Sequence, residues 1–499
     1  MSTFRKTIPG LLAAAVLLSP ATRLSNAAEP PGGRIGYVVL TDLDEDDPYL
    51  VAAQRLQEHR AARLIRFPSG HVAASLDAIR QAYPAFVALV VRPETLDVNL
   101  AYEVLELAVK VDDDPFADFA YGFITGATAA DALGLVERTV RAEAGPSPTS
   151  GRLLAFGPTS TPQADKGNAF EWLPAWSSKR IEHKPGPFPH RNLADLAAAD
   201  VIRFWGHGTP EGVDGSLIQA DLSGIGIRAR MVFAGPCFSA VTRRYYDAPA
   251  CSDKLEARCV DADNSLALTF LSKGALAYFG ALQEDRCISA GQEMEYALTS
   301  GEPVGMTLKH TQDLIAMAQT NGAMSFARFQ AGARPPAEKG LEAQLRLAAA
   351  RILLGDPAFL PFEASAGPAV KTGVRRAGSG LRVEATIVDP RIRSAFVNPF
   401  RDDLCTCGTD NDTLYVRARL PKSAGAIRGV RVVLPACLES AKHGAVQWRE
   451  EDWRGDRFLH VQIDFKHDAL REVALNTFFR FDLETQPSAE QENRQPPSR

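Results

Sequence analysis

The sequence predicts a protein of the α/β class with a parallel sheet, followed by an all-β domain. Short apolar runs that end at Gly or Pro alternate with segments of helical spacing as far as residue 362. Such runs are typical of buried parallel strands that have helices packed on both faces. Beyond residue 369 the apolar residues recur at every second position, as they do in half-buried antiparallel strands.

The first part of the α/β region, residues 29–145, is predicted to form a small parallel subdomain. Helical segments such as residues 49–60 separate its strands. The strand-like runs cover residues 35–40, 63–67 and 86–91. A Gly, Pro and Ser-rich stretch at 145–151 then predicts a linker.

The second part, residues 151–363, continues the alternation of strands and helices. Its predicted strands cover residues 153–156, 201–205, 231–234 and 275–279, and its long helices cover 308–319 and 340–354. A second boundary is expected at 363–368, where small residues, Gly and Pro gather.

The last part, residues 369–485, alternates apolar and polar residues along 414–420 and 458–465. This pattern predicts an antiparallel β-sandwich. Residues 486–499 are rich in Gln, Pro, Ser and Glu, which predicts a disordered tail.

Residues 1–28 have the pattern of a secretory signal peptide. Arg5 and Lys6 precede an apolar core at Leu11–Leu18, and small residues follow at Ser25–Ala28. The apolar stretch of about 11 residues is shorter than the roughly 20 that a membrane-spanning helix needs. We therefore expect a cleaved signal, a secreted or periplasmic protein, and no integral membrane segment after cleavage.

The composition excludes two broad classes of protein. With 45% hydrophobic and 23% charged residues, the chain can bury a large core and is not generally disordered. Its formal net charge of -5 gives no reason to expect nucleic-acid binding.

Six cysteines besides Cys237 form an even set, as expected where disulfides persist. Three bridges, two bridges with two thiols, or buried thiols throughout are the alternatives. The set is Cys251, Cys259, Cys287, Cys405, Cys407 and Cys437.

His207 and Cys237 each follow one of the apolar runs in the second part of the α/β region. Parallel strands deliver the residues that follow them to one edge of the sheet, where α/β proteins keep their sites. An imidazole and a thiol at the same edge form the minimal pair for nucleophilic catalysis. Gly206 and Gly208 flank the histidine and permit a close approach to the backbone.

The ordered set of motifs around this pair resembles the gingipain-type cysteine peptidases of the caspase-like clan. The resemblance covers residues 34–362 and rests on five segments, namely 118–126, 206–211, 233–237, 265–280 and 353–357. It implies a caspase-like catalytic domain made of two α/β subdomains and followed by an immunoglobulin-like domain.

The resemblance also implies a function and roles for individual residues. The chain would be an endopeptidase that acts on protein or peptide substrates, with Cys237 as nucleophile and His207 as proton carrier. The backbone N–H groups of Gly208 and Cys237 would form the oxyanion hole. No cofactor is required by this mechanism.

Asp112, Asp113, Asp114 and Asp118 form the densest acidic cluster of the sequence. A solvated loop is one interpretation. A structural calcium ion held by the three consecutive aspartates is another, because hard oxygen ligands suit calcium. The third is that Asp118 or Asp114 orients His207, as an upstream acid sometimes does in the family.

Two features depart from the gingipain pattern. Pro236 directly precedes the nucleophile, and strand-forming sequence already starts at Ile35, which leaves no room for a long propeptide.

Two other functions are possible for such a sequence. The main alternative is a catalytically inactive gingipain-like protein that serves in binding or surface processing. A glutamine-amidotransferase-like hydrolase does not fit, because residues 235–239 lack the Gly-x-Cys-x-Gly elbow of that class.

Overall fold

The computed structural model describes residues 36–145, 152–156, 189–213, 217–248, 252–285, 290–319, 324–336, 340–362, 370–378, 380–388, 411–466, 470, 473 and 476–486. Residues 35–499 form one compact unit. The predicted signal peptide, the boundary at 363–368, nearly all of the 145–151 linker and nearly all of the tail lie outside the described residues.

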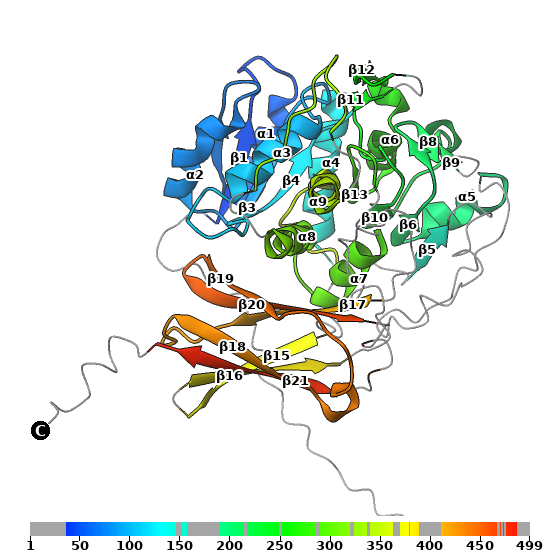
Figure 1. Ribbon diagram of the computed structural model, residues 1–499. Coiled ribbons are helices and arrows are strands. Elements are labelled where there is room, and N and C mark those ends of the chain that lie inside the picture. Colours follow the sequence, from blue (N-terminus) through cyan, green and yellow to red (C-terminus); the bar gives the residue numbers. More distant parts are fainter. Residues whose placement is uncertain are drawn as a thin grey trace, which may run out of the picture. The chain divides into compact units, whose positions relative to one another are not determined.

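A nine-stranded sheet, largely parallel as the sequence predicts, forms the centre of the α/β region (Figure 1). Its strands in spatial order are β2 (Arg63–Arg66), β1 (Tyr37–Thr41), β3 (Phe86–Val90), β4 (Ala120–Ile124), β14 (Arg351–Gly355), β13 (Ala277–Ala281), β10 (Met231–Ala234), β6 (Val201–Phe204) and β5 (Leu153–Phe156). All residues of β1, β4, β10, β13 and β14 are buried, which explains their continuous apolar runs.

Two of the helices beside this sheet, α3 and α4, begin at residues whose side chains cap them. Asp97 caps α3 by accepting the backbone N–H groups of Asn99 and Leu100, and Thr128 forms a capping box with Asp131 at the start of α4. The helices are α1 (Leu50–Arg60), α2 (Leu76–Ala82), α3 (Val98–Ala108), α4 (Ala129–Glu143), α5 (Pro189–Ala198), α6 (Leu266–Lys273), α7 (Ala290–Ser300), α8 (Val304–Ala318) and α9 (Leu341–Ala349).

The prediction of a single helix over residues 340–354 is wrong. The sequence predicts a helix over 340–354, whereas α9 ends at Ala349 and β14 begins at Arg351. Strand β14 runs antiparallel to β13, and its pairing with β4 is a single residue pair, Leu354 with Phe123. It thereby joins the two predicted subdomains into one sheet.

The two halves of the sheet present the ends of β3 and β10 at the same edge. Thr242, in the segment that follows β10, donates its hydroxyl to the carbonyl oxygen of Pro93, in the segment that follows β3, at 2.9 Å. The opposite edge is marked by a hydrogen bond of 2.8 Å from Tyr37, at the start of β1, to Asp356. Short sheets lie along the loops, namely β7 (Gly208–Thr209), β8 (Gly212–Val213) and β9 (Leu217–Ile218), and β11 (Arg244–Asp247) with β12 (Glu256–Cys259).

Two antiparallel sheets form the C-terminal region and are drawn from yellow to red in Figure 1. The first is ordered β15 (Val370–Ala377), β16 (Gly380–Ile387), β21 (Phe478–Thr485) and β18 (Ile427–Val433), and the second β17 (Asn411–Arg419), β20 (Asp456–Lys466) and β19 (Gln447–Trp453). Residues of both sheets, such as Val383 and Phe481 of the first and Val461 of the second, share one apolar core.

The strand order among these described residues differs from the immunoglobulin order. In an immunoglobulin constant domain the fifth strand lies with the first, second and fourth, and the seventh lies with the third and sixth. Here the fifth strand of the region, β19, lies with β17 and β20, and the seventh, β21, lies between β16 and β18. The described strands thus form two packed antiparallel sheets, but the immunoglobulin-like topology is not supported.

Within the described part of the chain, no helix has both the length and the apolar character needed to cross a membrane.

Candidate active site

His207 and Cys237 follow neighbouring strands that are paired in register. Strands β6 and β10 are parallel, with Val201 opposite Met231 and Phe204 opposite Ala234. The backbone N–H of Gly235 donates to the carbonyl oxygen of Phe204 at 2.8 Å, which extends the pairing by one residue. Each reactive residue lies three positions beyond its strand, so the register directs both to the same part of the sheet edge.

Gly208 brings the backbones of the two segments into direct contact. A Cβ atom built on Gly208 would lie 2.4 Å from the Cβ of Pro236 and 2.9 Å from the carbonyl oxygen of Cys237. Any side chain at this position would therefore force the segments apart. Gly206 adopts a φ of 135°, in the region that favours glycine, and His207 between the two glycines is exposed.

The turn at Cys237 is held by the segment that follows β13. Phe238 has a φ of 56°, an uncommon conformation for a residue with a side chain. Its backbone N–H donates to the carbonyl oxygen of Gln283 at 2.9 Å, and that of Ala240 donates to Ala281 at 2.9 Å. The half-buried Cys237 itself accepts a hydrogen bond at its Sγ from the backbone N–H of Asp285, at 3.4 Å.

The predicted oxyanion-hole groups belong to these adjoining backbones. Gly208 lies against the Cys237 peptide, as the short distance to the Cys237 carbonyl oxygen shows. The alignment of the Gly208 and Cys237 N–H groups toward a developing oxyanion stays a prediction.

The structure does not bring Asp118 or Asp114 to His207. Asp118 precedes β4 by two residues and therefore lies at the edge opposite to the one that follows β3 and β10. A five-residue strand separates these edges by roughly 16 Å at about 3.3 Å per residue. The proposed role of either aspartate in orienting His207 fails for this reason.

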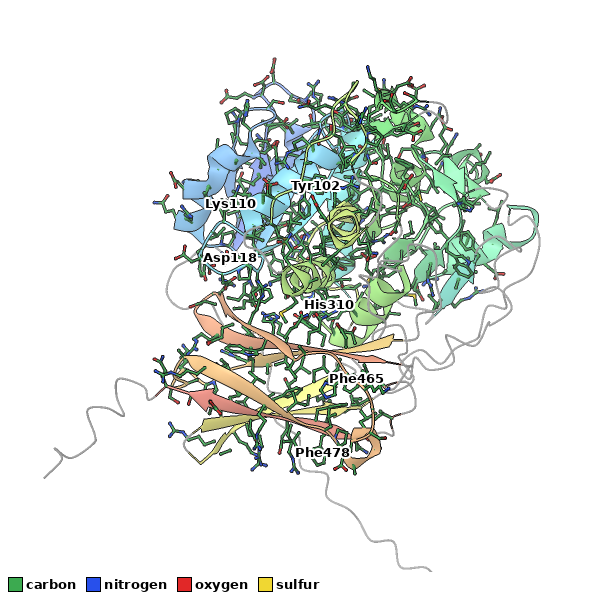
Figure 2. All side chains as sticks on the ribbon, in the orientation of Figure 1. Tyr102, Lys110, Asp118, His310, Phe465 and Phe478 are labelled. Atoms are coloured by element: carbon green, nitrogen blue, oxygen red, sulfur yellow. The ribbon has the colours of Figure 1, made fainter. Side chains whose placement is uncertain are left out.

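Both aspartates instead lie beside β19, where Figure 2 labels Asp118. Asp114 accepts the backbone N–H of Asp452 at 2.7 Å, and the indole N–H of Trp453 donates to the carbonyl oxygen of Asp118 at 2.9 Å. Burial raises the pKa of Asp114 to about 7 and that of Asp118 to about 9, and the neighbouring charge of Asp112 adds to both shifts.

The acidic loop uses its carboxylates to accept its own backbone N–H groups. Asp112 accepts the N–H of Asp114 at 2.9 Å, and Asp114 accepts that of Phe116 at 2.8 Å. No group of three or more His, Cys, Asp or Glu side chains within the described residues is arranged to hold a metal ion. A calcium ion at Asp112, Asp113 and Asp114 stays a prediction.

Two cysteines outside the candidate site limit the disulfide alternatives. Cys259 and Cys437 are exposed and form no disulfide, which excludes both the alternative of three bridges and that of buried thiols throughout. The other four, Cys251, Cys287, Cys405 and Cys407, lie outside the described residues.

One cluster of charged residues that adjoins the candidate nucleophile is not predicted from the sequence. Arg351, at the start of β14, is fully buried and pairs with Asp285 and Glu293. Its sequence signal is a single charged residue at the head of the apolar run that ends at Gly355. That signal is weak, because a charged residue beside an apolar run more often lies at a solvated end.

Comparison with known proteins gives matches among solved structures alone. No protein-family model matches the chain, and no curated protein matches it. The complex of the pro- and mature domains of Porphyromonas gingivalis RgpB aligns with a TM-score of 0.44 and 12% identity, over 71% of this chain and 86% of that one.

Two further structures match at a similar level. The Arg-specific cysteine proteinase gingipain R aligns with a TM-score of 0.44 and 12% identity, over 72% of this chain and 86% of that one. A structure described as a protease aligns with a TM-score of 0.43 and 9% identity, over 87% of this chain and 95% of that one. TM-scores at this level do not establish a shared fold, and the function proposed next depends on the positions of this chain's own residues.

Proposed function

We propose that this chain is an exported, gingipain-like cysteine endopeptidase that uses Cys237 and His207 as a catalytic dyad. The observation that carries the proposal is the contact of Gly208 with Pro236 and Cys237, which joins the histidine and cysteine segments at the ends of two paired strands. Export is proposed from the signal-like pattern of residues 1–28.

The proposed reaction is acyl transfer from a peptide to the enzyme and then to water. The Cys237 sulfur attacks the carbonyl carbon of the scissile bond while His207 takes the thiol proton and passes it to the leaving amine. Water then attacks the thioester carbonyl while His207 accepts its proton, the C–S bond breaks to release the new carboxyl end of the peptide, and His207 returns the proton to the Cys237 sulfur. Because Asp114 and Asp118 lie at the far edge of the sheet, the pair acts without a third acidic residue from that loop.

The backbone N–H groups of Gly208 and Cys237 are proposed to stabilise the negative charge that develops on the substrate oxygen. Loss of one such donor typically costs about 10²–10³-fold in rate. Fixed backbone donors suit this task because they need no rearrangement when the charge forms.

Peptide-library cleavage by residues 29–499 tests the proposal. Cys237→Ala and His207→Ala should each abolish cleavage, and the double variant should be little worse than either, because the two groups act as a unit. Cys259→Ala and His443→Ala, which alter exposed residues, are the matched controls and should retain activity. Additive losses of a few-fold from the two site variants would refute the dyad.

The alternative is a protein that keeps the fold for binding or surface processing without catalysis. Alkylation by iodoacetamide separates the two, because an activated thiolate reacts faster than ordinary thiols at neutral pH. Cys237 should be modified faster than the exposed Cys259 and Cys437, which serve as internal references. Equal rates together with absent cleavage would favour the non-catalytic protein.

A further inference from the structure

A fully buried arginine, Arg351, contacts two segments that adjoin the candidate nucleophile. The Arg351 side chain is 0% exposed, and its guanidinium meets Glu293 of α7 through two hydrogen bonds of 2.8 and 2.5 Å. It also pairs with Asp285 and donates to the carbonyl oxygen of Ala234 at 3.1 Å. Its partners thus come from α7, from the segment after β13 and from the end of β10.

Asp285 connects this cluster to the sulfur of Cys237. Its carboxylate is bound to Arg351, and its backbone N–H is the group that donates to the Cys237 Sγ at 3.4 Å. The ion pair and the sulfur contact belong to one residue, so the position of the N–H depends on where the carboxylate is held.

Stability alone does not account for such a cluster. Buried ion pairs can often be replaced by apolar residues with no loss of stability, since the desolvation of the charges offsets their attraction. A planar guanidinium that is hydrogen-bonded on several sides does, however, fix its partners in direction as well as in distance.

We propose that Arg351 is a positioning residue of the site, which holds Asp285 so that its backbone N–H points at the Cys237 sulfur and stabilises the thiolate. The inference rests on the proposed function in taking Cys237 as the nucleophile. A donor aimed at the sulfur favours the charged form of the thiol, which is the reactive form.

Two variants, each of which removes one negative charge beside Arg351, distinguish the positioning of the Asp285 N–H from the effect of charge alone. Asp285→Asn and Glu293→Gln each delete one carboxylate from Arg351. Loss of a negative charge alone would lower the thiol pKa of Cys237. Asp285→Asn should instead raise it by about one unit, because a neutral amide oxygen binds Arg351 less tightly than a carboxylate and holds the N–H less firmly, whereas Glu293→Gln should not raise it.

The measurement is the pH dependence of iodoacetamide alkylation of Cys237 in residues 29–499, resolved from the other cysteines by peptide mass spectrometry. A rise of one unit appears as about tenfold slower alkylation at pH values below the thiol pKa. Asp356→Asn is the control for general loosening. Asp356 is a buried partner of Arg60 next to the other end of β14, so its loss should leave the thiol pKa unchanged.

Each outcome decides the question. A fall or no change in Asp285→Asn, or an equal rise in Glu293→Gln or Asp356→Asn, would overturn the positioning role. Arg351→Lys should retain only part of the wild-type alkylation rate of Cys237, since an ammonium group cannot bridge both carboxylates in the same way. The readout needs no cleavage activity, so failure of the proposed peptidase function would be seen separately in the cleavage assay.

Discussion

Gly208 controls the spacing of the candidate dyad because it has no side chain. Its replacement by Ala would place a Cβ 2.4 Å from the Cβ of Pro236, so one segment must shift. A displacement of about 1 Å at a catalytic group can cost about 10²-fold in rate. We expect Gly208→Ala to lower kcat/KM for peptide cleavage by about that factor.

The matched control is Gly224→Ala, since a Cβ there would have no heavy atom within 4 Å. Chemical denaturation of both variants checks that the loss is local, with Gly208→Ala expected to cost about 1–3 kcal/mol as other overpacked sites do. Equal activity of the two variants would contradict the close contact that the proposed site requires.

Asp118 makes stability depend on pH in a predictable direction. Burial raises its pKa from 3.8 to about 9, so it is protonated in the folded state and ionised in the unfolded state between these values. The contribution of Asp118 to stability is therefore fully present below pH 4 and is lost as the pH rises toward 9, by up to about 1.4 kcal/mol per pH unit.

Asp118→Asn removes this dependence because the amide does not titrate. The variant should match the wild type near pH 4 and exceed it increasingly between pH 5 and 9. Urea denaturation of both proteins at several pH values measures the difference. A constant difference across this range would show that Asp118 is ionised in the folded protein.

At the scale of elements, helix α8 carries a buried lysine that ties it to β19. Lys309 has a 0% exposed side chain and contacts Asp313 at 2.8 Å and Glu451 at 2.6 Å. Lys309→Met should destabilise the fold by about 3–5 kcal/mol, since it leaves buried carboxylates without their cation.

A second substitution tests this explanation. Lys309→Met combined with Asp313→Leu should recover much of the loss, because Glu451 keeps Arg417 at 2.9 Å and His460 at 2.9 Å. Denaturant titration of the single and double variants gives the comparison. If the double variant is no more stable than Lys309→Met, the cost comes from packing rather than from uncompensated charge.

The elements that sequence reasoning finds are those whose pattern is local. Strands β6 and β10 are apolar runs closed by glycine, and they were predicted to within one residue at each end. The sequence of β14 predicts the end of a helix instead, because a short buried apolar run has no period that separates a strand from a helix.

The residues of the candidate site also differ in whether a local sequence pattern predicts them. His207 and Cys237 can be predicted because each closely follows a predicted strand. Arg351 meets Asp285 and Glu293 only through pairing of β14 with β13, which no local pattern encodes. The role assigned to Asp118 fails because the predicted strands do not include residues 120–124, and a residue that precedes a parallel strand lies at the edge opposite to the residues that follow the strands.

At the scale of the whole molecule, several buried or partly buried contacts join the C-terminal sheets to the α/β region. Phe116 stacks on His460 with ring centroids 3.9 Å apart, and Tyr83 accepts the backbone N–H of Arg454 at 2.9 Å. Together with the Lys309–Glu451 pair, these contacts join β19 and β20 to the edge of the sheet that lies away from Cys237.

Calorimetry should therefore give one heat-absorption peak for residues 35–499, because neither region keeps its buried polar groups satisfied without the other. A fragment of residues 370–486 made alone should be less stable than the same sheets in the full chain. Two separate transitions, with the β-rich part surviving the first, would show that the regions fold independently. The experiment requires no knowledge of the substrate.

The equal distances from each strand to its reactive residue have a consequence for comparing sequences. Three positions separate Phe204 from His207, and three separate Ala234 from Cys237. An insertion or deletion in either interval would turn one residue away from the other. Gaps in an alignment of related chains should therefore fall between Thr209 and Arg230, where length can vary without changing the chemistry, and not within these two short intervals.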